Sequence, residues 1–180
     1  MLLTYQNLSI CRATQADAET LCRWWNDGAV MAHAGFPHGL NTSAEAIAQS
    51  LAADTDSNCR LLLQIDSRPI GEMSYRSQGG GAVEIGVKIC EQAEQGKGFG
   101  VLYLRMLITY LFRSGYDKII LDTNANNNRA QHVYEKLGFQ KLRVNHDSWT
   151  NQAGELQSSV DYKLCKGVFA QWLESDTRAM

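Results

Sequence analysis

The stretch Gln95-Gly96-Lys97-Gly98-Phe99-Gly100, QGKGFG in one-letter code, lies directly before the apolar-rich segment VLYLRMLITYLF. Three glycines within five residues remove Cβ atoms from the backbone and let a ligand approach it closely. The apolar spacing that follows predicts a helix over about 98–114. Free N–H groups and the positive end of the dipole at a helix N-terminus suit a pyrophosphate. The stretch therefore predicts either a phosphate cradle or a strand-to-helix turn that needs unusual dihedral angles.

Two familiar nucleotide motifs do not fit these residues. The Walker A pattern requires Gly-Lys followed by Ser or Thr, whereas Lys97 is followed by Gly98. A Rossmann fingerprint has the spacing G-x-G-x-x-G and follows the first strand of its domain. The glycines here are spaced G-x-G-x-G, and they follow about the fourth expected strand. Both nucleotide-binding interpretations are set aside.

Strands and helices are expected in a mixed order on both sides of this stretch. The strands fall at 8–13, 59–65, 70–76, 82–89, 117–123, 139–149 and 156–165. The helices fall at about 16–25, 42–53, 98–114 and 127–138, with a short helix at the C-terminus and a loop over 26–41. Antiparallel hairpins thus flank one parallel βαβ step. This order predicts an α/β (α+β mixed) fold, with a mostly antiparallel sheet of about six to seven strands flanked by helices.

Composition fits one soluble domain over residues 1–180. Hydrophobic residues make up 44% of the chain, and 17 Lys and Arg against 19 Asp and Glu give a formal charge of −2. That balance predicts no general binding to nucleic acid. The start of the chain has no basic leader before a sustained apolar run, and no stretch has the length of a membrane span, so we expect a cytoplasmic protein with no membrane partner.

Metal and disulfide chemistry are not expected either. The five cysteines are scattered, odd in number and without a CxxC pair, which favours a reducing compartment. The four histidines lack HExxH spacing, and no carboxylate cluster accompanies them. We expect no metal.

Two motifs together resemble the GNAT N-acetyltransferase superfamily. Gln95, Gly98 and Gly100 match the pattern Q/R-x-x-G-x-G/A of that family's acetyl-coenzyme A (acetyl-CoA) pyrophosphate loop. Further on, NNRAQHVYEKLGF resembles the family segment N-x-x-A-x-x-x-Y-E-x-x-G-F, with Asn127 and Tyr134 at its functional positions. One helix and one strand separate the motifs, in the family's order, and the expected element order resembles the GNAT fold over nearly the whole chain.

The resemblance implies a set of cofactor contacts. Val87 and Ile89 would offer backbone groups to the pantetheine arm of acetyl-CoA. The amides of the loop residues Gln95, Gly96, Lys97, Gly98, Phe99 and Gly100 would hold the pyrophosphate, and Asn127 would also contact the cofactor. Tyr134 would lie beside the thioester sulfur and protonate or hydrogen-bond the departing thiolate. From the residues alone, Tyr134 can instead be a helix tyrosine that packs on the sheet.

The base that deprotonates the attacking amine has three candidates. Glu84 lies eleven residues before Gln95, which resembles the placement of the catalytic glutamate in histone-acetylating GNAT members. It alternates away from the Val83 and Ile85 face of its strand. Glu72, on the preceding strand, is a second candidate. A chain of water molecules is the third, since some GNAT enzymes use no single base.

The acceptor side is expected in the first third of the chain. The stretch RWWNDGAVM resembles the corresponding segment of the GNAT branch that includes ribosomal-protein N-terminal acetyltransferases. Trp25, His33, Phe36 and Glu72 are the candidate acceptor residues. The segment 145–159 looks like an exposed hairpin that could contact the substrate or a second subunit, which leaves a homodimer open.

The leading hypothesis is therefore acetyl transfer from acetyl-CoA to a primary amine, with a protein N-terminus as the preferred acceptor. A small amine such as a polyamine or an aminoglycoside is the alternative, because acidic residues could attract its cations. Those residues are Asp27, Glu72, Glu84 and Asp161. A cofactor-binding sensor or interaction module without turnover is the rival from another class.

Overall fold

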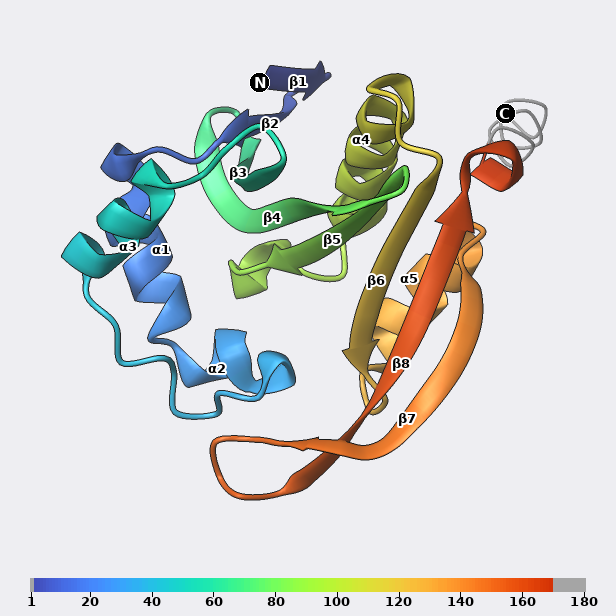
Figure 1. The fold of residues 1–180 in the computed structure, drawn as a ribbon. Helices are drawn as coiled ribbons and strands as arrows, with labels where there is room; N and C mark the ends of the chain where they lie inside the picture. The colour runs from blue at the N-terminus through green and yellow to red at the C-terminus, as the bar shows by residue number, and fades with distance from the viewer. Residues whose placement is uncertain (1, 170–180) are drawn as a thin grey trace.

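The computed structural model describes residues 2–169, and an eight-stranded sheet runs through it (Figure 1). The strands are β1 (Leu2–Tyr5), β2 (Leu8–Arg12), β3 (Asn58–Ile65), β4 (Arg68–Gly79), β5 (Ala82–Ile89), β6 (Lys118–Asn124), β7 (Gln140–Thr150) and β8 (Leu156–Cys165). Their order across the sheet is β1-β2-β3-β4-β5-β6-β8-β7, and only β5 and β6 pair in parallel. The mixed, mostly antiparallel α/β fold is confirmed, with one strand more than the six to seven expected.

The additional strand is β1, which pairs antiparallel with β2 from Leu2↔Cys11 to Tyr5↔Leu8. It has four residues, most of them exposed, so it shows no alternation of apolar and polar positions. The turn into β2 places Gln6 at φ 53°. Glycine or asparagine usually takes that conformation, so the turn carries no sequence signal. For these reasons the sequence did not predict β1.

Five helices and three 3₁₀ turns connect the strands. They are η1 (Gln15–Asp17), α1 (Ala18–Trp25), α2 (Gly28–Met31), η2 (Ala32–Ala34), α3 (Ala44–Ala52), η3 (Gln92–Glu94), α4 (Phe99–Arg113) and α5 (Asn128–Lys136). The expected loop at 26–41 contains the short helix α2. The expected C-terminal helix begins with helical residues 166–169, and its remainder lies outside the described residues.

The helices cover the two faces of the sheet and create two apolar cores (Figure 1). On one face, α4 and α5 pack against the inward side chains of the strands, among them Leu63, Val83 and Ile119, all fully buried. On the other face, α1 and α3 bury Leu21, Trp24 and Ile47 around Leu62 of β3. This second core covers only the β2–β4 side of the sheet, which leaves the polar face of β5, β6 and β8 uncovered by it.

Strands β5 and β6 separate after a short region of pairing. Their parallel register covers only Ala82↔Lys118, Val83↔Ile119 and Glu84↔Ile120. Beyond it, β5 continues to Ile89 beside β4, while β6 continues to Asn124 beside β8. The edges that face each other over this stretch have no partner strand, so the sheet opens there. The opening positions the candidate site.

Candidate functional site

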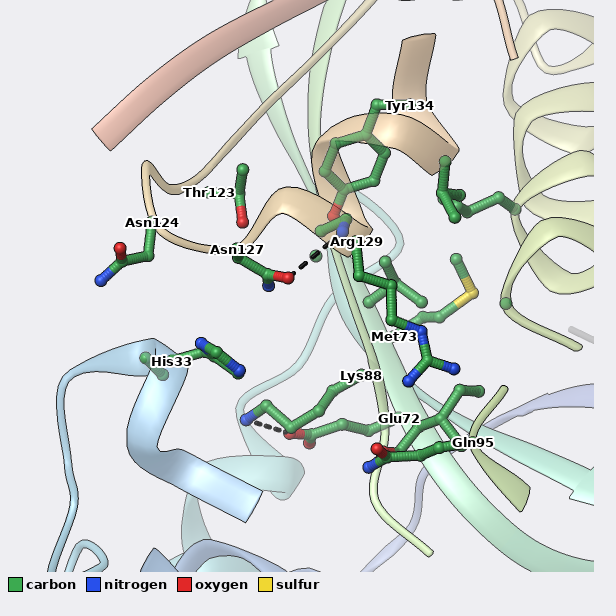
Figure 2. Close-up of a pocket in the computed structure, with 18 of the residues that line it drawn as sticks. His33, Glu72, Met73, Lys88, Gln95, Thr123, Asn124, Asn127, Arg129 and Tyr134 are labelled. Carbon is green, nitrogen blue, oxygen red and sulfur yellow. Dashed lines mark hydrogen bonds and ion pairs between the residues drawn. The ribbon is translucent and has the colours of Figure 1, made fainter. Parts of the chain in front are cut away.

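A cavity of about 1110 Å³ occupies the opening between β5 and β6 (Figure 2). The residues that line it come from β4, β5, β6, α2, η2, the glycine loop and the start of α5, among other segments. Nine of the ten predicted cofactor residues line it: Val87, Ile89, Gln95, Gly96, Gly98, Phe99, Gly100, Asn127 and Tyr134. Among the predicted acceptor residues, Trp25, His33 and Glu72 also line it. The sequence motifs therefore meet at one place.

The glycine loop presents bare backbone to the cavity. Gly96 and Gly98 have φ of 81° and 86°, a conformation that L side chains rarely adopt, and Gly98 caps the N-terminus of α4. Gly100 differs, because its φ is not positive and an added Cβ would meet no atom of the protein within 4 Å. Neither dihedral strain nor internal packing therefore requires glycine at position 100. The space in front of it suits a ligand.

The free cation at this loop is Arg129 rather than Lys97. Lys97 does not line the cavity, and its Nζ lies 3.0 Å from the carboxylate of Glu94. Arg129 makes no hydrogen bond or ion pair with residues 2–169, and its guanidinium extends toward Gln95 (Figure 2). A Cβ added to Gly96 would lie 3.4 Å from Nη2 of Arg129. Arg129 was not predicted from the sequence, because an arginine on a helix surface carries no signal of its own.

Tyr134 brings a buried phenol to the opening. Its ring packs 5.8 Å from Phe139 and 5.7 Å from Tyr162, and only 6% of the residue is exposed. The hydroxyl has no hydrogen-bond partner among the described residues and points toward the cavity (Figure 2). Burial, followed by the charge of Asp122, raises the pKa of Tyr134 to about 12. The phenol therefore stays protonated and remains a donor at neutral pH.

Asn127 holds the backbone at the entrance to α5. Its Oδ1 accepts a hydrogen bond of 3.2 Å from the amide of Ala130, which caps the helix. Gln95 plays a similar part at the other side of the cavity, since its Nε2 donates to the carbonyl of Ile89 at 2.9 Å. Both side chains fix the cavity wall, and their remaining polar atoms face it.

Glu72 belongs to a hydrogen-bonded group on the acceptor side. The indole Nε1 of Trp25 donates to its two carboxylate oxygens at 3.0 and 2.9 Å, and Nζ of Lys88 lies 3.3 Å from Oε1. Nζ of Lys88 also contacts the sulfur of Met31 at 2.9 Å. This group ties α1 and α2 to β4 and β5. Phe36 is 37% exposed and does not line the cavity.

Glu84 lies on the polar face of β5 but not in the cavity wall. Nη2 of Arg76 binds its carboxylate at 2.8 Å, and Gln78 donates to the same oxygen. Asp122 of β6, which the sequence analysis did not select, lines the cavity instead. The side chain of Asp122 is exposed, and loss of hydration beside the sheet, then the carboxylates of Glu84 and Asp161, raise its pKa.

The tip of the β7–β8 hairpin extends toward α2 (Figure 1) and is hydrogen-bonded to the loop that follows it. Gln152 lies at the tip of the hairpin, and its backbone N–H donates to the carbonyl of Gly35 at 2.8 Å. Its side chain accepts from the amide of His38 and donates to the carbonyl of Gly39, both at 3.0 Å. Trp149 packs on Gly35 and lines the cavity. The hairpin therefore closes one side of the acceptor region.

A model of the acetyltransferase (GNAT) domain matches residues 7–140. The chain belongs to the GNAT acetyltransferase family. No curated protein matches its sequence, and no helix among residues 2–169 is long and apolar enough to cross a membrane.

Solved structures share the GNAT fold at low sequence identity. The ribosomal L7/L12 alpha-N-protein acetyltransferase RimL, in complex with coenzyme A, has a TM-score of 0.82 and 15% identity, and the match covers 92% of this chain and 98% of that one. Spermidine N-acetyltransferase from Vibrio cholerae, in complex with CoA and spermine, has a TM-score of 0.80 and 18% identity, and the match covers 91% of this chain and 98% of that one. Ribosomal-protein-alanine N-acetyltransferase from Brucella melitensis has a TM-score of 0.74 and 20% identity, and the match covers 87% of this chain and 98% of that one.

Proposed function

We propose that this GNAT protein transfers an acetyl group from acetyl-CoA to a primary amine. The observation that carries the proposal is the hydroxyl of Tyr134, which has no partner among the described residues and is the accessible end of a buried side chain, in the opening between β5 and β6. A hydroxyl that no described residue occupies and that opens into a cavity is available to a bound ligand. A phenol with a pKa of about 12 can donate a proton or a hydrogen bond to a departing thiolate.

The residues present fit acetyl-CoA. The loop from Gln95 to Gly100 offers amides at the N-terminus of α4, and an added Cβ at Gly100 would occupy open space in front of it. Arg129 adds an unpaired positive charge beside the loop, which suits a phosphate. The free edge of β5 at Val87 and Ile89 supplies backbone groups for an extended pantetheine chain. When bound, acetyl-CoA supplies the activated acetyl group.

For the acceptor, we favour a flexible protein N-terminus. RimL and the Brucella enzyme are described as acetyltransferases of ribosomal proteins. The acceptor region lies between α2 and the β7–β8 hairpin, and the contacts of Gln152 narrow it. A thin, extended chain fits such a passage better than a folded surface does.

A small polyamine is the second candidate acceptor. The observation that favours it is the number of carboxylates on the acceptor side, where Glu72 and Asp122 both line the cavity. Carboxylates attract cations over a Debye length of about 8 Å at physiological salt. The Vibrio structure that shares this fold is described as a spermidine acetyltransferase with spermine bound.

Thiol release from acetyl-CoA tests the proposal. The purified protein is mixed with acetyl-CoA and, in separate reactions, an alanine-initiated peptide, spermidine and an aminoglycoside. Free CoA and the acetylated amine are then quantified together. Equal amounts of both products support the transferase, and the preferred amine identifies the acceptor class. Tight CoA binding without any acetylated product would instead favour a cofactor-binding sensor.

A further inference from the structure

Three carboxylates lie on the polar face of adjacent strands next to the cavity. Asp122 of β6 is directly opposite Asp161 of β8, and Glu84 of β5 is opposite Ile120, two positions earlier on β6. Because side chains two positions apart share a face of a strand, all three carboxylates point to the same side. Their mutual repulsion agrees with the direction of the Asp122 pKa, which Glu84 and Asp161 help to raise.

Two of the three carboxylates already have a cation. Arg76 binds Glu84 at 2.8 Å, and Nε of Arg143 binds Asp161 at 2.6 Å, with Asn145 donating to the other oxygen at 2.9 Å. Asp122 has no hydrogen bond from a side chain and no ion pair with residues 2–169. It is also the one of the three that lines the cavity. Asp122 is therefore the exposed carboxylate of the three, and it is open to a ligand in the cavity.

The hydroxyl of Tyr134 marks the same position independently. It comes from α5 on the opposite side of the sheet, is the accessible end of a side chain that is nine-tenths buried, has no partner among the described residues and points into the cavity. Asp122 lines the same cavity, and its charge helps to raise the pKa of Tyr134. A donor and a carboxylate, both without a partner among the described residues, thus border one cavity.

We propose that Asp122 binds the ammonium group of the acceptor and takes its first proton. This inference rests on the proposed function and assigns the base that the sequence left open. An exposed carboxylate in the cavity wall without an ion-pair partner can bind the positive charge that a protonated amine carries. Glu72 and Glu84 suit the role less well, because each already holds a cation, Lys88 and Arg76 respectively. Protonation of either glutamate would weaken that ion pair.

Asp122 takes one proton from the ammonium, which leaves a neutral amine with a lone pair. The nitrogen bonds to the acetyl carbonyl carbon, the carbon–sulfur bond breaks, and its electron pair goes to sulfur. Tyr134 protonates the thiolate and regains a proton from the nitrogen, which becomes an amide. Asp122 releases its proton to water, so each turnover yields one amide, one CoA thiol and one proton.

Charged groups around Asp122 set its pH dependence. A carboxylate with a raised pKa accepts a proton more readily than an ordinary aspartate, and its anionic form is present above that pKa. The groups that face it are Glu84 with its partner Arg76, Asp161 with its partner Arg143, Lys163 on the same face of β8, and Tyr134. Lys163 is in register with Ile120 rather than with Asp122 and forms no ion pair to it.

The test compares Asp122→Asn with Glu84→Gln in the full chain. For each variant, kcat/KM is measured between pH 6 and pH 10 with spermidine and with an alanine-initiated peptide, and CoA affinity is measured by calorimetry. We expect Asp122→Asn to lower kcat/KM by on the order of 100-fold near neutral pH, the usual size of a general-base effect. The loss should shrink as pH rises, because more of the amine arrives deprotonated. CoA affinity and the melting temperature should not fall.

Several outcomes would overturn this assignment. If Asp122→Asn keeps the wild-type kcat/KM, Asp122 is not the base. If kcat/KM falls by the same factor at every pH, Asp122 does not take the proton from the ammonium group. A pH-dependent loss in Glu84→Gln alone would assign the base to Glu84. If the wild-type protein binds CoA but acetylates neither probe, the proposed function fails first, and a wild-type control in the same assay distinguishes that failure.

Discussion

Replacing Gly100 with alanine should stabilise the protein and weaken CoA binding at the same time. Gly100 is in the first turn of α4 without a positive φ, and an added Cβ meets no protein atom within 4 Å. Alanine at such a position gains about 0.4–1 kcal/mol by restricting the unfolded chain. For a chain of this size that gain corresponds to a rise in melting temperature of about 1–4 °C.

The same methyl group would occupy the space that we assign to the pyrophosphate. Overpacking by one such group costs about 1–3 kcal/mol, which corresponds to a Kd for CoA that is about 5- to 150-fold weaker. Calorimetric titration with CoA and thermal unfolding measure the two effects on one sample. Opposite signs in the two experiments are the result that a ligand cradle predicts.

Two other glycines provide matched controls. Gly167 also has no positive φ and open space at its Cβ, but it lies in the segment after β8, away from the cavity. Gly167→Ala should share the stabilisation without any effect on CoA. Gly98 has φ 86°, so Gly98→Ala should lose about 1–2 kcal/mol through backbone strain. If Gly100→Ala binds CoA as tightly as the wild type, the cradle at Gly100 is refuted.

Three further variants test the rest of the site. Tyr134→Phe should lower kcat by at least about 100-fold. The melting temperature should stay level, since no described residue hydrogen-bonds the Tyr134 hydroxyl. A pKa of about 12 also predicts that the wild-type pH–rate profile shows no loss of activity from Tyr134 ionisation below about pH 11. Arg129→Met should weaken CoA binding by about 10- to 100-fold and flatten its salt dependence; an unchanged Kd would remove Arg129 from the phosphate site. Gln152→Ala removes two side-chain hydrogen bonds to the loop after α2; acceptor KM should rise with CoA affinity unchanged, and a fall in stability of about 1–2 kcal/mol should accompany it.

The sequence predicted those parts of the fold that local signals determine. The helix expected at 98–114 is α4 at Phe99–Arg113, and the alternation in β5 buries Val83 and Ile85 as expected. The helix expected at 42–53 is α3 at Ala44–Ala52, and Ser43 caps it. Strand β1 was missed because its turn at Gln6 contains no glycine, proline or asparagine at the positive φ.

The site was harder to predict because its geometry depends on contacts between distant segments. Asp122 reads as part of an apolar strand, and only the separation of β5 from β6 brings it to the cavity. Glu84 has the spacing of a catalytic glutamate, but its ion pair with Arg76 follows from the β4–β5 register. Lys97 had the more obvious charge for a phosphate, yet it pairs with Glu94 while Arg129 from α5 stays free. Spacing along the chain specifies motifs but not the partners of their side chains.

A crystal structure of the protein with CoA would show directly whether the cofactor occupies the opening between β5 and β6. We predict that the pyrophosphate binds the amides between Gln95 and Gly100, and that the pantetheine arm follows the free edge of β5. The sulfur should then lie within hydrogen-bond reach of the Tyr134 hydroxyl, about 3.5 Å for this atom pair. CoA bound elsewhere, or with its sulfur directed away from Tyr134 and Asp122, would contradict the account.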